Sequence, residues 1–374
     1  MKITRYLQGM IGSDLRDKMV FIGGPRQVGK TTLAREFIKN KDQYLTWDDL
    51  EDRKIIKSHQ IDSKIGTVIF DEIHKYARWR TLVKGLFDKY SDELSIIVTG
   101  SARLDHFRRG GDSLVGRYHY YRLHPLTISE LGDVKANQNL QQLLIFGGFP
   151  EPFLKKSEAF HRRWQRERIN RVVYQDLRDL DTVKDLSKLE LLVDALPSRV
   201  GSPLSIRSLQ EDLEVSPNTV DRWISVLEAI YYCYRIPPFG APKIRAVKQA
   251  KKLYLWDWSE IQSAGPRFEN LVAGHLLKYC HFIEDTQGHR MELRYIRDTN
   301  LREVDFVVLK DKSPIFAVEC KSGENALSPH IRYFKERTKI PKFYQVHLGA
   351  KDYGTPADGR VLPFTTFCKE LNLV

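Results

Sequence analysis

The hydrophobic positions in the first third of the chain fall into short runs that predict buried β-strands. Residues 19–24 (MVFIGG), 66–72 (GTVIFDE) and 94–101 (LSIIVTGS) are largely apolar until each run ends in polar residues or glycine. Strands that read as continuous apolar runs are typical of parallel sheets covered by helices on both faces. Because helical stretches separate these runs, the pattern over residues 18–130 predicts a parallel α/β sheet.

The pattern changes further along the chain. A glycine- and proline-rich break at residues 146–153 (FGGFPEPF) lies near the start of an arginine-rich, helical stretch. A small helical unit with β-strands follows, and from residue 267 the order becomes helix, strand, strand, helix, strand. We therefore predict four segments, at residues 1–135, 136–195, 196–258 and 259–374.

A glycine-rich motif follows the first predicted strand. It reads GPRQVGKT over residues 24–31 and matches G-x-x-x-x-G-K-T between a strand and a helical run. In such a loop, backbone N–H groups surround a phosphate, Lys30 reaches the β- and γ-phosphates, and the Thr31 hydroxyl holds Mg²⁺. Thr32 suits the start of the helix better than a ligand role. The predicted ATP-binding residues are Gly24, Gln27, Val28, Gly29, Lys30 and Thr31, and Thr32, at the start of the helix, completes the predicted nucleotide-binding segment.

Two acidic residues close the second predicted strand. Asp71 and Glu72 fall at its carboxyl end, where ligands of open α/β sheets bind. Asp71 fits as a partner of the Mg²⁺ held by Thr31, and Glu72 fits as the base that orients an attacking water. The pair predicts an ATP hydrolase rather than a nucleotide-controlled switch.

Polar residues also end the third predicted strand. Ser101 and Arg103 lie where a side chain senses the γ-phosphate, and Arg117 follows shortly afterwards. An arginine placed against a neighbouring subunit's nucleotide would compensate charge on the transferring phosphoryl group. Because this stretch holds many arginines, a solvated surface position is nearly as good an interpretation of any one of them as a nucleotide contact.

Residues 203–239 have the pattern of a helix-turn-helix unit followed by a strand. Ser216 is a good N-cap residue and Pro217 suits the first position of the second helix. The outer face of that helix would carry Asn218, Thr219 and Arg222 into a DNA major groove. Asp221 on the same face argues against tight sequence reading, and a role as a lid or a protein contact stays open.

A basic segment connects the two strands predicted at residues 231–239 and 251–257. Basic residues in such a segment contact phosphates without reading sequence. The predicted phosphate contacts are Lys243, Arg245, Lys248, Lys251 and Lys252.

Two apolar runs near the carboxyl end carry acids where a strand should be most buried. Asp305 lies inside residues 301–309 (LREVDFVVL), and Glu319 and Lys321 share one face of residues 315–323. Burial of an unpaired charge costs several kcal/mol, whereas a divalent cation offsets that cost. We predict a site for Mg²⁺ or Mn²⁺ and an activated water at Asp305 and Glu319, with Lys321 beside them and Glu269 as a further ligand from an amphipathic helix.

Among the features of the composition, only the net charge adds a class of partner to this picture. The 374 residues carry a net charge of +12 and a pI near 9.3, which favours polyanions: nucleic acid first, an anionic membrane surface second. No apolar run approaches the roughly 20 residues that span a bilayer, and no signal-peptide core is present, so a cytoplasmic protein without a membrane partner is expected. Four widely spaced cysteines argue against structural zinc and disulfides.

Taken together, the motifs resemble the AAA-like P-loop ATPases of bacteria and archaea. The resemblance rests on GPRQVGKTT, DEIHK, TGSAR, GRYHYYRLHPLTISEL and GGFPEPF. It implies an arginine finger at Arg117, a sensor region at Ser101 and Arg103, a winged helix over residues 196–258, and a homo-oligomer, with a ring as one form.

The carboxyl-terminal motif resembles the PD-(D/E)xK, or restriction-endonuclease-like, nucleases, whose positions are filled by Glu269, Asp305, Glu319 and Lys321. The expected function is an ATP-hydrolysing, DNA-binding protein that remodels or moves along DNA and cleaves it. Two alternatives stay open: a regulatory, DNA-binding ATPase whose nuclease-like domain does not cleave, and an ATPase that remodels proteins or signals.

Overall fold

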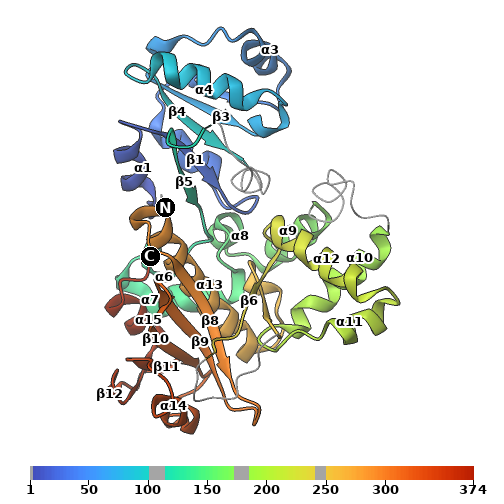
Figure 1. Cartoon of the computed structure of the whole chain (residues 1–374), viewed down its shortest axis with the longest axis vertical. Helices are drawn as coiled ribbons and strands as arrows, with labels where there is room; N and C mark the ends of the chain where they lie inside the picture. The colour runs from blue at the N-terminus through green and yellow to red at the C-terminus, as the bar shows by residue number, and fades with distance from the viewer. Residues whose placement is uncertain (1–2, 101–113, 172–184, 241–249) are drawn as a thin grey trace. The chain divides into compact units, whose positions relative to one another are not determined.

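The chain forms two compact units (Figure 1). The computed structural model describes residues 3–100, 114–171, 185–240 and 250–374. The N-terminal unit comprises residues 1–125 and 229–231, and the C-terminal unit comprises residues 126–228 and 232–374. Each is described here by itself.

A five-stranded parallel sheet organises the N-terminal unit, with the strand order β2-β3-β4-β1-β5. Its strands are β1 (Met19–Gly23), β2 (Tyr44–Thr46), β3 (Thr67–Asp71), β4 (Ser95–Thr99) and β5 (Tyr118–Arg122). The predicted parallel sheet is confirmed. The sequence pattern missed the two edge strands, because β2 is short and half-buried and β5 mixes tyrosines with polar residues.

Helices and 3₁₀ turns connect these strands. They are α1 (Gln8–Asp14), α2 (Lys30–Ala34), η1 (Arg35–Phe37), η2 (Lys41–Gln43), α3 (Leu50–Ser58), η3 (Ser63–Ile65), η4 (Ile73–Lys75) and α4 (Trp79–Tyr90). The apolar face of α4, with Trp79, Leu82 and Leu86, packs against Phe21 and Phe70 of the sheet. This packing leaves the carboxyl ends of β1 and β3 free to carry polar residues.

The C-terminal unit begins with a helical part that ends in a small antiparallel hairpin. Its elements are α6 (Ile128–Leu131), η5 (Asp133–Lys135), α7 (Ala136–Phe146), α8 (Pro150–Lys155), α9 (Glu158–Arg171), α10 (Leu186–Ala195), η8 (Leu196–Arg199), α11 (Ile206–Leu213), α12 (Pro217–Ala229), β6 (Cys233–Ile236) and β7 (Lys252–Leu255). Val220, Ile224 and Leu227 form the buried face of α12, opposite the predicted outer face. The Ser216 hydroxyl accepts a hydrogen bond from the Thr219 N–H (3.2 Å), as predicted for an N-cap.

A six-stranded mixed sheet organises the rest of this unit, in the order β12-β13-β11-β10-β9-β8. Its elements are η9 (Trp258–Glu260), α13 (Ala264–Gln287), β8 (Met291–Arg297), β9 (Glu303–Lys310), β10 (Ser313–Cys320), α14 (Pro329–Lys335), β11 (Phe343–His347), β12 (Tyr353–Thr355), β13 (Gly359–Pro363) and α15 (Phe364–Glu370). The antiparallel register places Val318 opposite Phe306, so Glu319 and Asp305 are the next neighbours on β10 and β9. The long helix α13 packs on β8 and β9 (Figure 1).

Among the helices of the described ranges, none combines the length and the apolar character needed to cross a bilayer.

Candidate functional site

The glycine-rich loop between β1 and α2 has a backbone that only certain residues tolerate. Gly24 has φ +136°, and a Cβ there would lie 2.4 Å from the Leu123 carbonyl oxygen. Gly29 and Gln27 also have positive φ, of 98° and 62°. Glycine at position 24 is therefore required by close packing as well as by conformation.

Lys30 lies across this loop. Its side chain is buried, and its Nζ donates to the carbonyl oxygens of Gly24 (2.8 Å) and Pro25 (2.7 Å). Ionised phosphate oxygens are stronger partners for an ammonium than neutral carbonyls are. The loop therefore holds the lysine where a nucleotide phosphate can take over its hydrogen bonds.

Three hydroxyl groups surround the Asp71 carboxylate at the end of β3. Thr31 Oγ1 (3.0 Å) and the Tyr44 hydroxyl (2.6 Å) donate to Oδ2, and Thr99 Oγ1 (2.6 Å) donates to Oδ1. Burial, together with Asp71, raises the pKa of Tyr44, so the phenol is a neutral donor. Hydroxyl and carboxylate oxygens are ligands that Mg²⁺ prefers, and Thr31 with Asp71 supplies both.

Glu72 follows Asp71 in the left-handed region, with φ +54°. Its Oε2 is buried and accepts no hydrogen bond, while His74 Nε2 and Lys75 Nζ each lie 3.6 Å away. Burial raises the pKa of Glu72, and Lys75 and Lys30 partly oppose the rise. A partly desolvated carboxylate with an oxygen that accepts no hydrogen bond suits a general base.

The other predicted nucleotide contacts are not gathered around the loop in the part of the chain that the structure describes. Arg117 forms a surface ion pair with Asp88, through Nε (2.6 Å) and Nη2 (3.1 Å). Thr32 is exposed within α2, and Ser101 and Arg103 lie outside the described residues.

Two residues that the sequence reasoning missed hold this site together. One is Tyr44, described above. The other is Arg5, whose buried guanidinium donates from Nη1 to the Val28 carbonyl (2.7 Å) and from Nη2 to the His124 carbonyl (2.5 Å). No motif signals either residue, because both act across long sequence separations.

The predicted DNA-reading face of α12 is partly available. Asn218 and Arg222 are exposed, while the Thr219 hydroxyl shares a hydrogen bond with Ser216 Oγ (2.8 Å). Arg235 of β6 pairs with Asp221, which reduces the negative charge on this face. Lys243, Arg245 and Lys248 lie outside the described residues.

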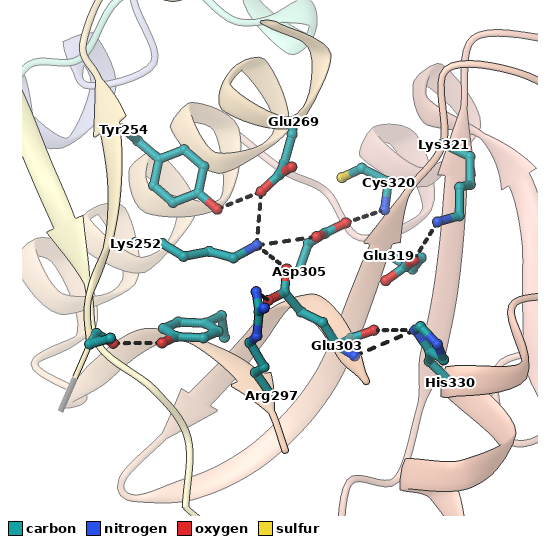
Figure 2. A network of polar contacts seen from close by, with 12 residues as sticks. Lys252, Tyr254, Glu269, Arg297, Glu303, Asp305, Glu319, Cys320, Lys321 and His330 are labelled. Carbon is teal, nitrogen blue, oxygen red and sulfur yellow. Dashed lines mark hydrogen bonds and ion pairs between the residues drawn. The ribbon is translucent and has the colours of Figure 1, made fainter. Parts of the chain in front are cut away.

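Lys252 differs from its prediction as an exposed phosphate contact. Its side chain is 0% exposed, and its Nζ lies 3.1 Å from Glu269 Oε1, 2.5 Å from Glu303 Oε1 and 3.3 Å from Asp305 Oδ1 (Figure 2). Burial would lower the pKa of Lys252, but the three carboxylates outweigh it and raise the pKa. The phosphate prediction for Lys252 is wrong, because these ion pairs offset the cost of burial.

Asp305, Glu319 and Lys321 do lie together at the ends of β9 and β10 (Figure 2). Lys321 Nζ is 2.7 Å from Glu319 Oε1, and Asp305 Oδ2 accepts a hydrogen bond from the Cys320 N–H (2.8 Å). Burial and the nearby Asp305 raise the pKa of Glu319 to about 8. Glu319 Oε2 is buried and has no hydrogen-bond partner.

Few carboxylate oxygens of this cluster are left for a metal ion. Within the described ranges, no group of three or more His, Cys, Asp or Glu side chains is arranged to hold a metal ion. Glu269 is occupied by Lys252 and by the Tyr254 hydroxyl (2.7 Å). Both Asp305 oxygens are engaged, Oδ1 by Lys252 and Oδ2 by the Cys320 N–H, and Glu319 Oε1 is engaged by Lys321. Glu319 Oε2 is therefore the one oxygen of this pair without a hydrogen-bond partner.

Comparisons with known families divide the chain into three matched regions. Residues 16–132 match the family described as an AAA domain. Residues 137–263 and 264–367 match two families described as domains of unknown function (DUF8612 and DUF4143). The N-terminal unit therefore carries an AAA-like P-loop ATPase domain.

Relatives of similar sequence are uncharacterised proteins. One from Mycobacterium tuberculosis is 24% identical over 248 residues, covering 65% of this chain and 55% of that protein. The chain thus spans about half the length of that relative. Two from Methanocaldococcus jannaschii are each 22% identical, one covering 89% of this chain and 81% of its own length, the other 91% and 82%.

Two solved structures give weak overall likenesses. The ORC1 protein of Aeropyrum pernix, in complex with DNA, has a TM-score of 0.30 and 13% identity, covering 73% of this chain and 94% of that chain. A signal transduction ATPase with a tetratricopeptide repeat sensor from Pyrococcus horikoshii has a TM-score of 0.26 and 12% identity, covering 76% and 48%. At these TM-scores neither likeness bears on function.

Proposed function

We propose that this chain is an ATP-hydrolysing, DNA-binding enzyme that works as a homo-oligomer. The observation that carries the ATPase part is the convergence of Lys30, Thr31 and Asp71 with the carboxylate of Glu72, whose Oε2 accepts no hydrogen bond. These groups supply, within one loop and one strand end, the parts that phosphoryl transfer requires.

Each residue has a distinct role in this proposal. The loop backbone and Lys30 bind the β- and γ-phosphates, and Thr31 and Asp71 would hold Mg²⁺, which would neutralise charge that develops on the phosphates. Glu72 orients the attacking water and accepts its proton through Oε2. Tyr44 and Thr99 fix the Asp71 carboxylate, and Arg5 fixes the loop.

Separating nucleotide binding from hydrolysis tests the ATPase proposal. Lys30→Ala should abolish both, because it removes the phosphate contact. Glu72→Gln should retain ATP binding but lose turnover by about 10²–10⁴-fold, the usual contribution of a general base. Fluorescent-nucleotide binding and phosphate release measure the two effects, with the exposed Lys54→Ala on α3 as a control. If Glu72→Gln turns over ATP within a few-fold of the wild-type rate, Glu72 is not the general base.

DNA is the proposed partner because of charge and the exposed face of α12. The chain carries a net charge of +12, and Arg222 and Asn218 lie exposed where the Ser216 cap starts the helix. The pairing of Asp221 with Arg235 supports this role, since it lowers the repulsion between α12 and phosphates. A winged-helix type of contact follows if the β6–β7 hairpin lies beside the DNA backbone.

We also propose, as a second function, metal-dependent cleavage of DNA at Asp305, Glu319 and Lys321. The specific observation is the buried, unpartnered Glu319 Oε2 beside Asp305. A Mg²⁺ or Mn²⁺ ion bound there would activate a water molecule and polarise the phosphodiester. Lys321, oriented by Glu319, would stabilise negative charge on the phosphate.

Labelled linear, circular and branched DNA, incubated with Mg²⁺ or Mn²⁺, tests cleavage directly. Asp305→Asn and Lys321→Ala should each lose cleavage, whereas Lys312→Ala, in the turn between β9 and β10, should keep it. ATP hydrolysis should persist in all three variants. If wild type hydrolyses ATP and binds DNA but its cleavage equals that of Asp305→Asn, the C-terminal unit binds DNA without cutting it.

A further inference from the structure

A lysine from the small hairpin completes the carboxylate cluster of the C-terminal sheet. Lys252 reaches from β7 to Glu269 on α13 and to Glu303 and Asp305 on β9, and no part of its side chain is exposed (Figure 2). Its Nζ also lies 5.5 Å from the centre of the Tyr295 ring on β8. The ammonium therefore sits where four elements meet.

Strand β7 is held so that Lys252 cannot readily leave. The Asn270 side chain accepts from the Leu255 N–H (2.7 Å) and donates to the Leu255 carbonyl (2.8 Å). Tyr254, two residues from Lys252, donates to the same Glu269 oxygen that Lys252 contacts. These bonds fix β7 on α13, and with it the position of the ammonium.

Four carboxyl groups and three cations form one network. The carboxyl groups belong to Glu269, Glu303, Asp305 and Glu319, and the cations belong to Lys252, Lys321 and Arg297. Among the side-chain oxygens of these four acids, Glu319 Oε2 is buried without a hydrogen-bond partner, and Glu319 as a whole is only 4% exposed. One added divalent cation satisfies this oxygen, whereas a second would meet Lys252 at close range.

We propose that Lys252 is a built-in cation of this cluster, so that the cluster binds one divalent cation, at Asp305 and Glu319, and gains a second site only when Lys252 is lost. The single-ion part rests on the metal-dependent function proposed above. The second part rests on the contacts of Lys252 alone. Because β7 belongs to the hairpin that follows α12, the module proposed to bind DNA supplies this cation.

Removing the positive charge of Lys252 should convert its three carboxylates into a metal site. Lys252→Met keeps an unbranched side chain but ends one atom short of Nζ, so Glu269, Glu303 and Asp305 are left around a position without a cation. Three carboxylates without a counterion favour a divalent cation strongly. Lys252→Arg keeps the charge and should keep wild-type stoichiometry.

Calorimetric titration with Mn²⁺, without nucleotide, measures this stoichiometry on the full chain. Every protein carries Asp71→Asn, so that the predicted P-loop metal site does not contribute. We expect one Mn²⁺ per chain for this parent, none with Glu319→Gln, two with Lys252→Met and one with Lys252→Arg. Equal stoichiometry for Lys252→Met and the parent, or two ions in the parent, would overturn the proposal.

The same titration distinguishes failure of this inference from failure of the proposed cleavage. If the parent binds no Mn²⁺ that depends on Glu319, the cleavage proposal loses its metal. If Lys252→Met then binds one Mn²⁺ more than the parent, the role of Lys252 is still supported. If Lys252→Met is unfolded in EDTA, circular dichroism measures whether added Mn²⁺ or Ca²⁺ refolds it. Refolding by the metal supports the proposal, and a variant that neither metal refolds counts against it.

Discussion

Tyr44 shows how one side chain outside any motif can orient the carboxylate of Asp71, the proposed Mg²⁺ partner. It shares Asp71 Oδ2 with Thr31, and the Arg35 guanidinium lies 4.2 Å from the centre of its ring. Because Thr31 also donates to Oδ2, the hydrogen bond from Tyr44 fixes the orientation of the carboxylate oxygen that would contact a cation beside Thr31. We infer that Tyr44 is a positioning residue for the proposed ATPase.

Tyr44→Phe removes this hydroxyl and keeps the ring. We expect kcat for ATP hydrolysis to fall about 10-fold, roughly 1.4 kcal/mol of transition-state stabilisation, with a changed Mg²⁺ requirement and a similar KM for ATP. Steady-state assays over a range of Mg²⁺ concentrations measure the effect. Tyr90→Phe at the end of α4 is the matched control. An unchanged kcat would remove Tyr44 from the proposed mechanism.

The buried acid Glu319 should make stability depend on pH. Its pKa is raised from 4.5 to about 8 by burial and Asp305, so the folded chain binds the proton more tightly than the unfolded chain does. Its contribution to stability is therefore fully present below pH 4.5 and is lost as the pH rises through about 8.

Glu319→Gln should abolish that loss. In EDTA, the unfolding free energy of the variant relative to wild type should rise with pH by up to about 1.4 kcal/mol per unit over this window. Urea unfolding at several pH values measures the difference. In Glu324→Gln the slope should be absent, because hydrogen bonds from Ala350 and Lys351 lower the pKa of Glu324. A flat difference for Glu319→Gln would contradict the assignment.

At the scale of elements, α12 combines a predictable core face with an outer face whose charge depends on a neighbouring strand. The inner positions follow the helical period, whereas Asp221 is paired only because β6 brings Arg235 beside it. Helix and hairpin therefore have to be considered together when DNA binding is assessed.

Arg222→Ala should weaken DNA binding by removing one exposed cation from α12. If Arg222 contacts a phosphate, the slope of log K against log salt concentration should decrease by about 1, and the loss should be similar for all DNA sequences. Fluorescence anisotropy at several salt concentrations measures both. Arg207→Ala on α11, where Glu211 already pairs the arginine, should change neither. An unchanged slope for Arg222→Ala would exclude a phosphate contact.

On the scale of the whole molecule, the proposed oligomer would place Arg117 at a subunit boundary. In the single chain, Arg117 is paired with Asp88, so a role at a neighbouring nucleotide requires this surface ion pair to open. Exposed ion pairs contribute little to stability, so their exchange for a phosphate contact is feasible.

Mixing two inactive variants tests whether Arg117 acts on a neighbouring subunit. Arg117→Ala should lower turnover while ATP binding persists, and Lys30→Ala should bind no ATP. Mixed oligomers should regain hydrolysis, because Lys30→Ala subunits supply the arginine and Arg117→Ala subunits supply the nucleotide site. Phosphate release from the mixture, compared with each variant alone, measures the recovery. Additive residual activity without recovery would show that Arg117 does not act between subunits.

The sequence by itself determined the features that local patterns encode. The strands β1, β3 and β4, the glycine-rich loop and the capped start of α12 depend on contiguous residues, because strand periodicity, loop conformation and helix caps are set within a few positions. The placement of Asp305 and Glu319 near each other was also predictable, since both lie in strands that are adjacent along the chain.

Only the tertiary structure decided which side chains complete each site. Tyr44 lies 27 positions from Asp71, and Lys252 lies 53 positions from Asp305. No local period relates residues so far apart, and a lysine in a basic stretch looks solvated until the carboxylates that surround it are known. Whether a charged group lies in water or among opposite charges depends on packing between elements. That packing buries Lys252 and pairs it with Glu269.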